Sequence, residues 1–158
     1  MDLRGFRMLS LIQLVTHARV DIAGATAAAI SKGITALVGI EKSDTEIEAR
    51  KMVERILQYR IFPDNQGRMN LSLRDVQGDL LIVPQLTLVA ETNKGTRPGF
   101  SAGMAPEAGK KLFEYLVTHA RQQYARVEAG VFGAYMQVSL CNDGPVTFLL
   151  KAESRHAG

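Results

Sequence analysis

The sequence predicts an α+β fold in which a mainly antiparallel, curled β-sheet packs against two helices. Its 158 residues, 46% hydrophobic and 22% charged, suffice for one globular core. β-rich runs recur along the chain, about seven in all, between breaks that contain Gly or Pro. Two segments have the 3.6-residue apolar period of a helix. We therefore expect a single domain over residues 1–158, with a sheet that curls toward a barrel.

The first third of the chain contains three expected strands. Residues 9–16 are rich in β-forming side chains, and the run continues to Ile22, before Gly24 breaks it. Residues 25–30 and 34–40 are two further β-rich runs.

The first helix is predicted from a capping box at Ser43-Asp44-Thr45-Glu46, in which the Ser hydroxyl and the Glu carboxylate bind exposed amides at the helix start. One face of this helix is apolar and is expected to be buried. That face comprises Ala49, Met52, Val53, Ile56 and Leu57. The opposite, solvated face comprises Arg50, Lys51, Glu54 and Arg55.

The middle of the chain carries the strongest strand signal, at residues 79–89. Before it, a short strand at 59–62 ends in a turn, and residues 69–73 can pair back. Because proline cannot donate to a β-ladder, the strand at 79–89 is expected to bend or to lie at an edge at Pro84. A polar, glycine-rich loop follows at 91–103, of a length typical of functional loops.

The last third begins with a helix opened by Pro106-Glu107. The residues expected to recur on one side of this helix are Ala108, Leu112, Tyr115, Leu116 and His119. Strands through Val131, 136–140 and 146–150 then end the chain, and Gly144-Pro145 is interpreted as a hairpin turn between the last two.

Residues typical of common catalytic or metal sites are scarce. His17, His119 and His156 are far apart, so we expect no metal site and no cofactor; His119 is expected to be half-buried and His156 to lie in a frayed tail. Neither a phosphate-binding loop nor a Gly-x-Ser-x-Gly elbow occurs. The single Cys141 cannot form an internal disulfide and is interpreted as a structural thiol.

Charge and targeting signals favour a cytoplasmic protein. The apolar stretch at 8–15 is interrupted by Ser10 and Gln13, which excludes a signal peptide, and no segment is long enough for a membrane span. A net charge of +3 and a pI near 9.2 permit a nucleic-acid partner without requiring one.

Three segments combine residues in unusual ways. The first, Pro84-Gln85-Leu86-Thr87-Leu88, places polar groups in an apolar run, where they need hydrogen-bond partners. The second, at 93–101, is a basic loop in which Lys94 and Arg97 suit phosphates and Phe100 suits stacking; a merely solvated loop has the same composition. The third is 142–148, around Gly144-Pro145.

In this order and spacing, the three segments resemble the D-aminoacyl-tRNA deacylase family. The resemblance covers about residues 8–151 and leaves a short extension at each end. Its most specific parts are Arg97-Pro98-Gly99-Phe100-Ser101 and Asn142-Asp143-Gly144-Pro145-Val146-Thr147-Phe148. Other matches are Leu11-Ile12-Gln13, Tyr59-Arg60-Ile61-Phe62 and Gln137-Val138-Ser139-Leu140. The resemblance implies a homodimer of small barrel-like domains with helices against them.

The resemblance also implies a mechanism that needs no catalytic histidine. The terminal adenosine of the tRNA would bind at the dimer interface, and the RNA's own 2′-hydroxyl would assist hydrolysis of the aminoacyl ester. Gln85, Leu86 and Thr87 would form a catalytic strand whose backbone amides hold the carbonyl oxygen. Phe132 and Met136 would pack the adenine ring.

By the same resemblance, Gly144-Pro145 is a chirality filter. The pair would enter the partner subunit's pocket with a cis peptide bond and exclude L side chains sterically. Glycine has no side chain to exclude, so glycyl-tRNA is an expected second substrate.

Two departures leave alternatives open. Pro84 replaces the serine with which the family's first motif begins, and Leu14 replaces an arginine that helps to hold the Gly-Pro pair. Both changes resemble a paralogous branch with a trans Gly-Pro bond that removes small L residues such as L-Ala. A non-catalytic DNA-binding protein is the second alternative.

Overall fold

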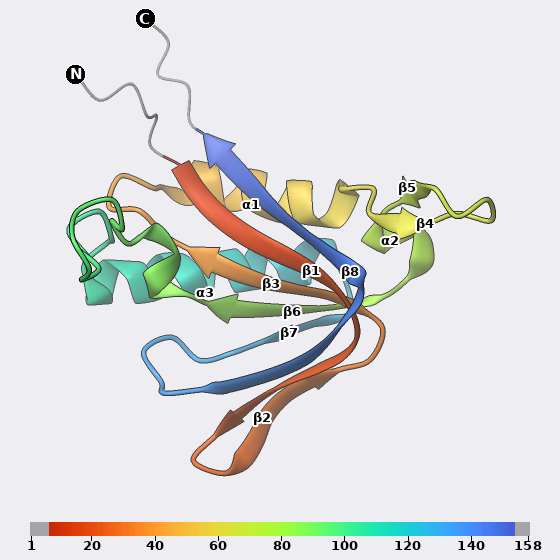
Figure 1. Ribbon diagram of the computed structural model, residues 1–158, viewed down its shortest axis with the longest axis horizontal. Coiled ribbons are helices and arrows are strands. Elements are labelled where there is room, and N and C mark those ends of the chain that lie inside the picture. Colours follow the sequence, from red (N-terminus) through yellow and green to blue (C-terminus); the bar gives the residue numbers. More distant parts are fainter. Residues whose placement is uncertain (1–6, 154–158) are drawn as a thin grey trace, which may run out of the picture.

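The computed structural model describes residues 7–153, and both terminal extensions, with His156, lie outside the described residues. A six-stranded sheet curls strongly, and two long helices cover one of its faces (Figure 1). The strand order is β2-β1-β3-β6-β7, with β8 paired to β1. The strands are β1 (Arg7–Ile22), β2 (Ala25–Ile30), β3 (Gly33–Gly39), β6 (Asp79–Pro84), β7 (Val127–Ala129) and β8 (Gln137–Glu153). The predicted α+β class is confirmed.

The sheet is mainly antiparallel, as predicted, but it also contains two parallel ladders that the sequence did not indicate. β1 pairs antiparallel with β2, β3 and β8, but β3–β6 and β6–β7 are parallel. The physical reason is connectivity: α1 (Glu46–Gln58) lies between β3 and β6 in the chain, and α3 (Pro106–Gln123) lies between β6 and β7. Crossover connections through a helix join parallel strands.

The segment between α1 and β6 forms a small extension at one end of the molecule. β4 (Phe62–Pro63) and β5 (Met69–Leu71) pair antiparallel, as predicted, although β4 is shorter than expected. A third helix, α2 (Leu73–Val76), follows and was not predicted. It is only four residues long, too short for a periodic pattern.

Helix α1 confirms the predicted apolar face, whose five residues are all buried. The cap is different from the prediction. Thr45, not Ser43, is the N-cap, and its side chain and that of Glu48 form the capping box. Both registers satisfy the sequence rule, and the structure uses the later one.

Helix α3 begins at Pro106, as predicted, but its buried face is shifted by one position from the expected one. The buried residues are Gly109, Leu112, Phe113, Leu116, Val117 and Ala120. Ala108 is exposed, whereas His119 is half-buried and stacks on Tyr115.

Two apolar clusters hold the layers together. The larger lies between the sheet and the helices and includes Ile12, Ile34, Ile56, Leu80 and Leu116. The smaller lies on the other face, inside the curl, and is formed by Val15, Ala18, Val20, Ala28, Ile30, Leu81 and Val83. Burial on both faces explains why β6 reads as an unbroken apolar run.

Two predictions for the last third are wrong. β8, Gln137–Glu153, is one long strand, so Gly144-Pro145 is not a hairpin turn, and Val131 lies in the segment after β7. Cys141 lies within β8 and is exposed. The β1–β8 ladder continues on both sides of the Gly-Pro pair, with register shifts opposite it between Gln13 and His17. A bulge can hold a Gly-Pro pair inside a strand, because the unpaired residues need not donate to the ladder.

Candidate active site

The segment Pro84-Gln85-Leu86-Thr87-Leu88, which we call the first motif, lies where β6 ends. The prediction that this motif lies on a strand is wrong. β6 stops at Pro84, and residues Leu86–Val89 form a short 3-10 helix, η1. The backbone N–H of Gln85 still donates to the carbonyl oxygen of Val38 at 2.8 Å, which fixes the start of η1 against β3. The motif is therefore a turn held at the end of a buried strand.

Within this turn, Gln85 and Thr87 bind each other. The Gln85 side-chain N–H donates to the Thr87 hydroxyl oxygen. Gln85 is half-buried, whereas Leu86 and Thr87 are exposed. The first N–H groups of a helix have no partner inside that helix, so the amides of Leu86 and Thr87 make no hydrogen bond within η1.

Gly39 allows η1 to approach the sheet this closely. A Cβ at this position would lie 2.9 Å from the Leu88 Cβ and 3.3 Å from the Gln85 carbonyl oxygen. Gly39 was not among the residues that the sequence pattern predicted for the site. A glycine inside a β-rich run is the signal that points to such a close approach.

The chain that leaves β7 brings Phe132 and Met136 to the same end of β6. Gly130 donates its N–H to the Ile82 carbonyl at 2.8 Å. A Cβ at Gly130 would lie 2.9 Å from the Met136 sulfur and 3.3 Å from Pro84 Cδ, so Met136 packs beside the start of the motif. Phe132 packs on α3, with its ring centroid 6.1 Å from that of Phe113.

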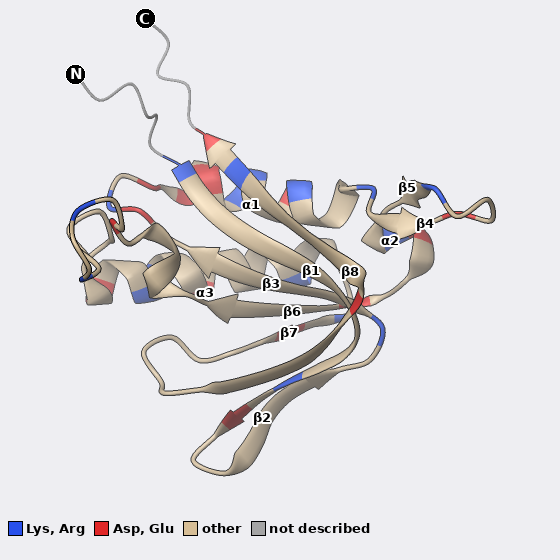
Figure 2. Ribbon diagram, viewed as in Figure 1, with Lys and Arg blue, Asp and Glu red and all other residues tan. Residues whose placement is uncertain are grey.

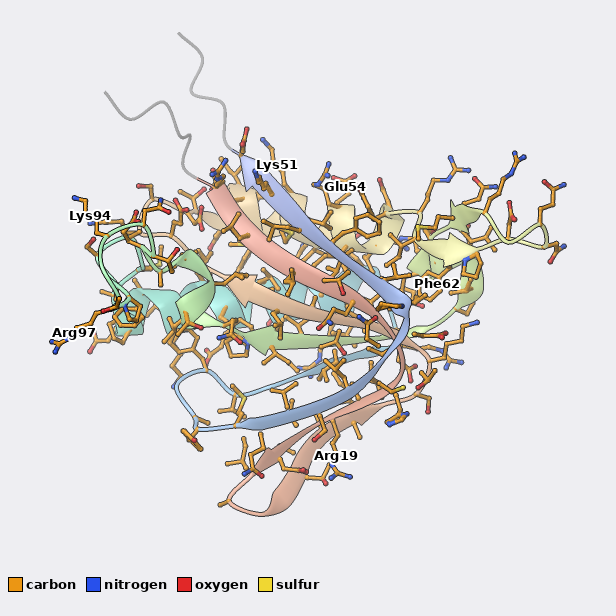
Figure 3. All side chains as sticks on the ribbon, in the orientation of Figure 1. Arg19, Lys51, Glu54, Phe62, Lys94 and Arg97 are labelled. Atoms are coloured by element: carbon orange, nitrogen blue, oxygen red, sulfur yellow. The ribbon has the colours of Figure 1, made fainter. Side chains whose placement is uncertain are left out.

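The basic loop at 91–103 also lies at this end. Antiparallel bridges fasten it, Glu91 to Gly99 and Glu41 to Gly103. Lys94 and Arg97 are exposed, and in Figure 3 their side chains extend away from the body of the molecule. Phe100 is exposed as well, at 58%. The loop therefore presents two cations and an aromatic ring to solvent.

Gly144 and Pro145 lie elsewhere, on the exposed bulge of β8, and the peptide bond between them is cis. The bulge is held from beneath by Asn142, whose side chain donates to the Thr147 hydroxyl at 2.9 Å and accepts from the Val146 N–H at 3.2 Å. Gln13 also donates to Thr147, at 3.3 Å.

The sheet register separates this bulge from the first motif. Opposite the bulge lies Leu14 of β1, which is aligned through Ile34 with Leu80 of β6. The bulge is thus four residues along the strands from Pro84, which is roughly 13 Å. It is also three strand spacings across the sheet from Pro84, which is roughly 14 Å. Together these give a separation of about 19 Å between the bulge and Pro84. Within one subunit the two motifs do not meet.

The site so defined gathers Gln85, Thr87, Phe132 and Met136 at one end of β6. Among residues 7–153, no three His, Cys, Asp or Glu side chains are grouped so as to hold a metal ion. In the same range, no helix is both long and apolar enough to cross a membrane. Fold and site define a class of small α+β domains with a curled sheet, in which a Gln-Thr turn follows the end of a buried strand.

Comparison with known proteins identifies the family. The model of the D-Tyr-tRNA(Tyr) deacylase family matches residues 11–151, and the chain belongs to this family. A D-aminoacyl-tRNA deacylase of Nitrosococcus oceani is 54% identical over 144 residues, which are 91% of this chain and 93% of the relative. One of Stutzerimonas stutzeri is 50% identical over 145 residues, 92% of this chain and 100% of the relative. The family resemblance inferred from the sequence is confirmed.

Solved structures agree on the fold. The c-Myc DNA unwinding element binding protein has a TM-score of 0.87 and 37% identity, with 94% of this chain and 99% of that one covered. A probable eukaryotic D-amino acid tRNA deacylase has a TM-score of 0.80 and 18% identity, with 92% of this chain and 99% of that one covered. At that identity the second likeness concerns the fold alone.

Proposed function

We propose that this chain hydrolyses the ester bond of D-aminoacyl-tRNA, and of glycyl-tRNA, as a proofreading step of translation in the cytoplasm. The observation that carries the proposal is the family match over residues 11–151, with relatives of at least 50% identity that are named D-aminoacyl-tRNA deacylases. The same relatives favour this function over a chirality-relaxed deacylase that removes small L-amino acids such as L-Ala, or a non-catalytic DNA-binding protein.

In the proposed reaction, the amides of Leu86 and Thr87 hold the ester carbonyl oxygen as negative charge develops on it. The hydrogen bond between Gln85 and Thr87 keeps the turn in this shape. Thr87 is an orienting hydroxyl in this scheme, and the 2′-hydroxyl of the terminal adenosine assists the attack by water. Neither a metal nor a cofactor takes part.

The tRNA end binds across the same end of β6. Phe132 and Met136 pack the adenine ring, while Lys94 and Arg97 of the basic loop meet phosphates and Phe100 offers a stacking surface. Figure 2 shows Lys and Arg segments both in this loop and on the adjoining part of α3.

The active site is completed by a second copy of the chain. Gly144 and Pro145 lie about 19 Å from the first motif of their own subunit by the strand spacing. In a homodimer they would enter the partner subunit's pocket and leave no room for an L side chain. Exposed apolar residues near these motifs give the dimer a surface to bury: Leu86, Val131, Tyr135, Val138 and Leu149.

A deacylation assay tests the proposal. Purified protein is incubated with D-Tyr-tRNA, Gly-tRNA, L-Ala-tRNA and L-Tyr-tRNA, and amino acid release is followed. We expect release of D-Tyr and glycine, with both L-aminoacyl-tRNAs left intact. No release from any substrate would refute the enzyme, and L-Ala release as fast as glycine release would refute exclusion of L side chains. Duplex DNA binding without turnover would favour the DNA-binding alternative.

A further inference from the structure

A cavity of about 480 Å³ lies between α3 and the turn that follows β7. We call it the α3–β7 pocket. Its lining includes Phe113, Val117 and Thr118 from the helix and Gly130, Val131 and Phe132 from the turn. A volume of this size is in the range that accommodates one nucleotide-sized ligand.

The charged residues of the pocket all come from α3. Lys110 and Arg121 lie at its two ends along the helix, and Glu114 lies between them. Lys110 and Glu114 form an ion pair at 3.9 Å, with about 60% of each side chain exposed. Such an exposed pair contributes little stability, so Lys110 can turn to another anion at small cost.

Phe132 belongs both to the pocket and to the surface proposed for the terminal adenine. The ring packs against α3, since a Cβ added at Gly109 would lie 3.0 Å from its tip. A single-stranded RNA end whose last base reaches Phe132 has the α3–β7 pocket next to that base, within reach of its preceding nucleotide. Aromatic side chains flanked by cations suit a base and its phosphate there.

We propose that the α3–β7 pocket binds the nucleotide that precedes the terminal adenosine of the tRNA, with Lys110 and Arg121 on its phosphates and the apolar lining against its base. This inference rests on the proposed function and extends it along the RNA. It assigns the residues a role in tRNA affinity alone, because they touch neither the ester nor the amides of η1.

The test compares two substrates that share the ester but differ in RNA length: D-Tyr-tRNA and D-Tyr esterified to adenosine alone. The pocket variant is Lys110→Ala with Arg121→Ala. The matched control, Lys111→Ala with Arg68→Ala, also removes one lysine and one arginine charge, but from exposed positions outside the pocket. Thermal unfolding of each variant checks that the fold is kept.

We expect the pocket variant to raise the KM for D-Tyr-tRNA about 10-fold, with kcat and the KM for D-Tyr-adenosine unchanged. The slope of log KM against log salt should fall by about 1.4, since each phosphate contact on a single strand contributes about 0.7. The control should change the tRNA KM less than about 2-fold.

A second variant works in the opposite direction. Glu114 is the one carboxylate among the described residues that line the pocket, so Glu114→Gln should lower the KM for D-Tyr-tRNA by about 2- to 3-fold.

The proposal is overturned if the pocket variant and the control give the same KM for D-Tyr-tRNA. It is also overturned if the KM for D-Tyr-adenosine rises in parallel, because the residues then act on the terminal adenosine or on the fold. A wild-type protein that releases D-Tyr from neither substrate refutes the deacylase function itself, which is a distinct result.

Discussion

The carboxyl group of Asp44 is buried, and it should make the stability of this protein pH-dependent. The residue is 5% exposed at the start of α1. Its Oδ2 accepts the backbone N–H of Glu41 at 2.7 Å, whereas Oδ1 has no hydrogen-bond partner among the described residues. Burial raises the pKa of Asp44 from 3.8 to about 7; the Glu41 hydrogen bond opposes this rise, and the Glu41 and Glu48 carboxylates add to it.

The magnitude follows from the two pKa values. Each pKa unit corresponds to about 1.4 kcal/mol, so folding with Asp44 ionised costs at most about 4 kcal/mol. Below pH 3.8 the carboxyl is protonated in both states, and the cost is absent. Between pH 3.8 and about 7 the folded state keeps a proton that the unfolded state releases, so the free energy of unfolding falls as the pH rises. Above pH 7 the full cost is present.

Asp44→Asn removes this titration and keeps an oxygen that can accept the Glu41 N–H. Urea unfolding of both proteins from pH 5 to pH 9 measures the difference. We expect the variant to gain about 3 kcal/mol of stability relative to the wild type between pH 5 and pH 7, with a plateau above pH 7. A stability difference that does not change with pH, or one that shrinks as the pH rises, would contradict the reasoning.

Two further changes test packing. Gly39→Ala should displace η1, because the new Cβ would lie 2.9 Å from that of Leu88. We expect the free energy of unfolding to fall by about 1–3 kcal/mol, with a larger fractional loss of deacylation. The control Gly103→Ala, whose Cβ meets nothing nearer than 3.6 Å, should be neutral in both assays. Tyr124→Phe removes a buried hydroxyl that donates to the Gly78 carbonyl at 2.5 Å and should cost about 1–3 kcal/mol in urea unfolding; an unchanged midpoint would count against this bond.

Local patterns predicted the fold where local physics decides it. The buried face of α1 follows from a period of 3.6 residues, and the end of regular pairing at Pro84 follows from the missing N–H. The long β8 strand could not be read in this way. Gly144-Pro145 has the composition of a turn, and it remains inside a strand because β1, far away in the sequence, pairs with β8 on both sides of it.

In the candidate site, too, the sequence indicated which residues take part but not the conformations that long-range contacts impose. The motif residues Gln85 and Thr87 were identified through family resemblance, but their turn conformation depends on the contact of η1 with β3. Gly39 was missed because its importance lies in that long-range contact. The separation of Gly144-Pro145 from the first motif likewise required the register of the sheet.

In the proposed reaction, the protein supplies positioned donors while the RNA supplies its own 2′-hydroxyl. The most direct test compares D-Tyr release from tRNA that ends in adenosine with release from tRNA that ends in 2′-deoxyadenosine, each at saturating enzyme. We expect the deoxy substrate to bind but to be hydrolysed at least about 100-fold more slowly. Equal rates for the two substrates would contradict this expectation and would require a catalytic group in the protein.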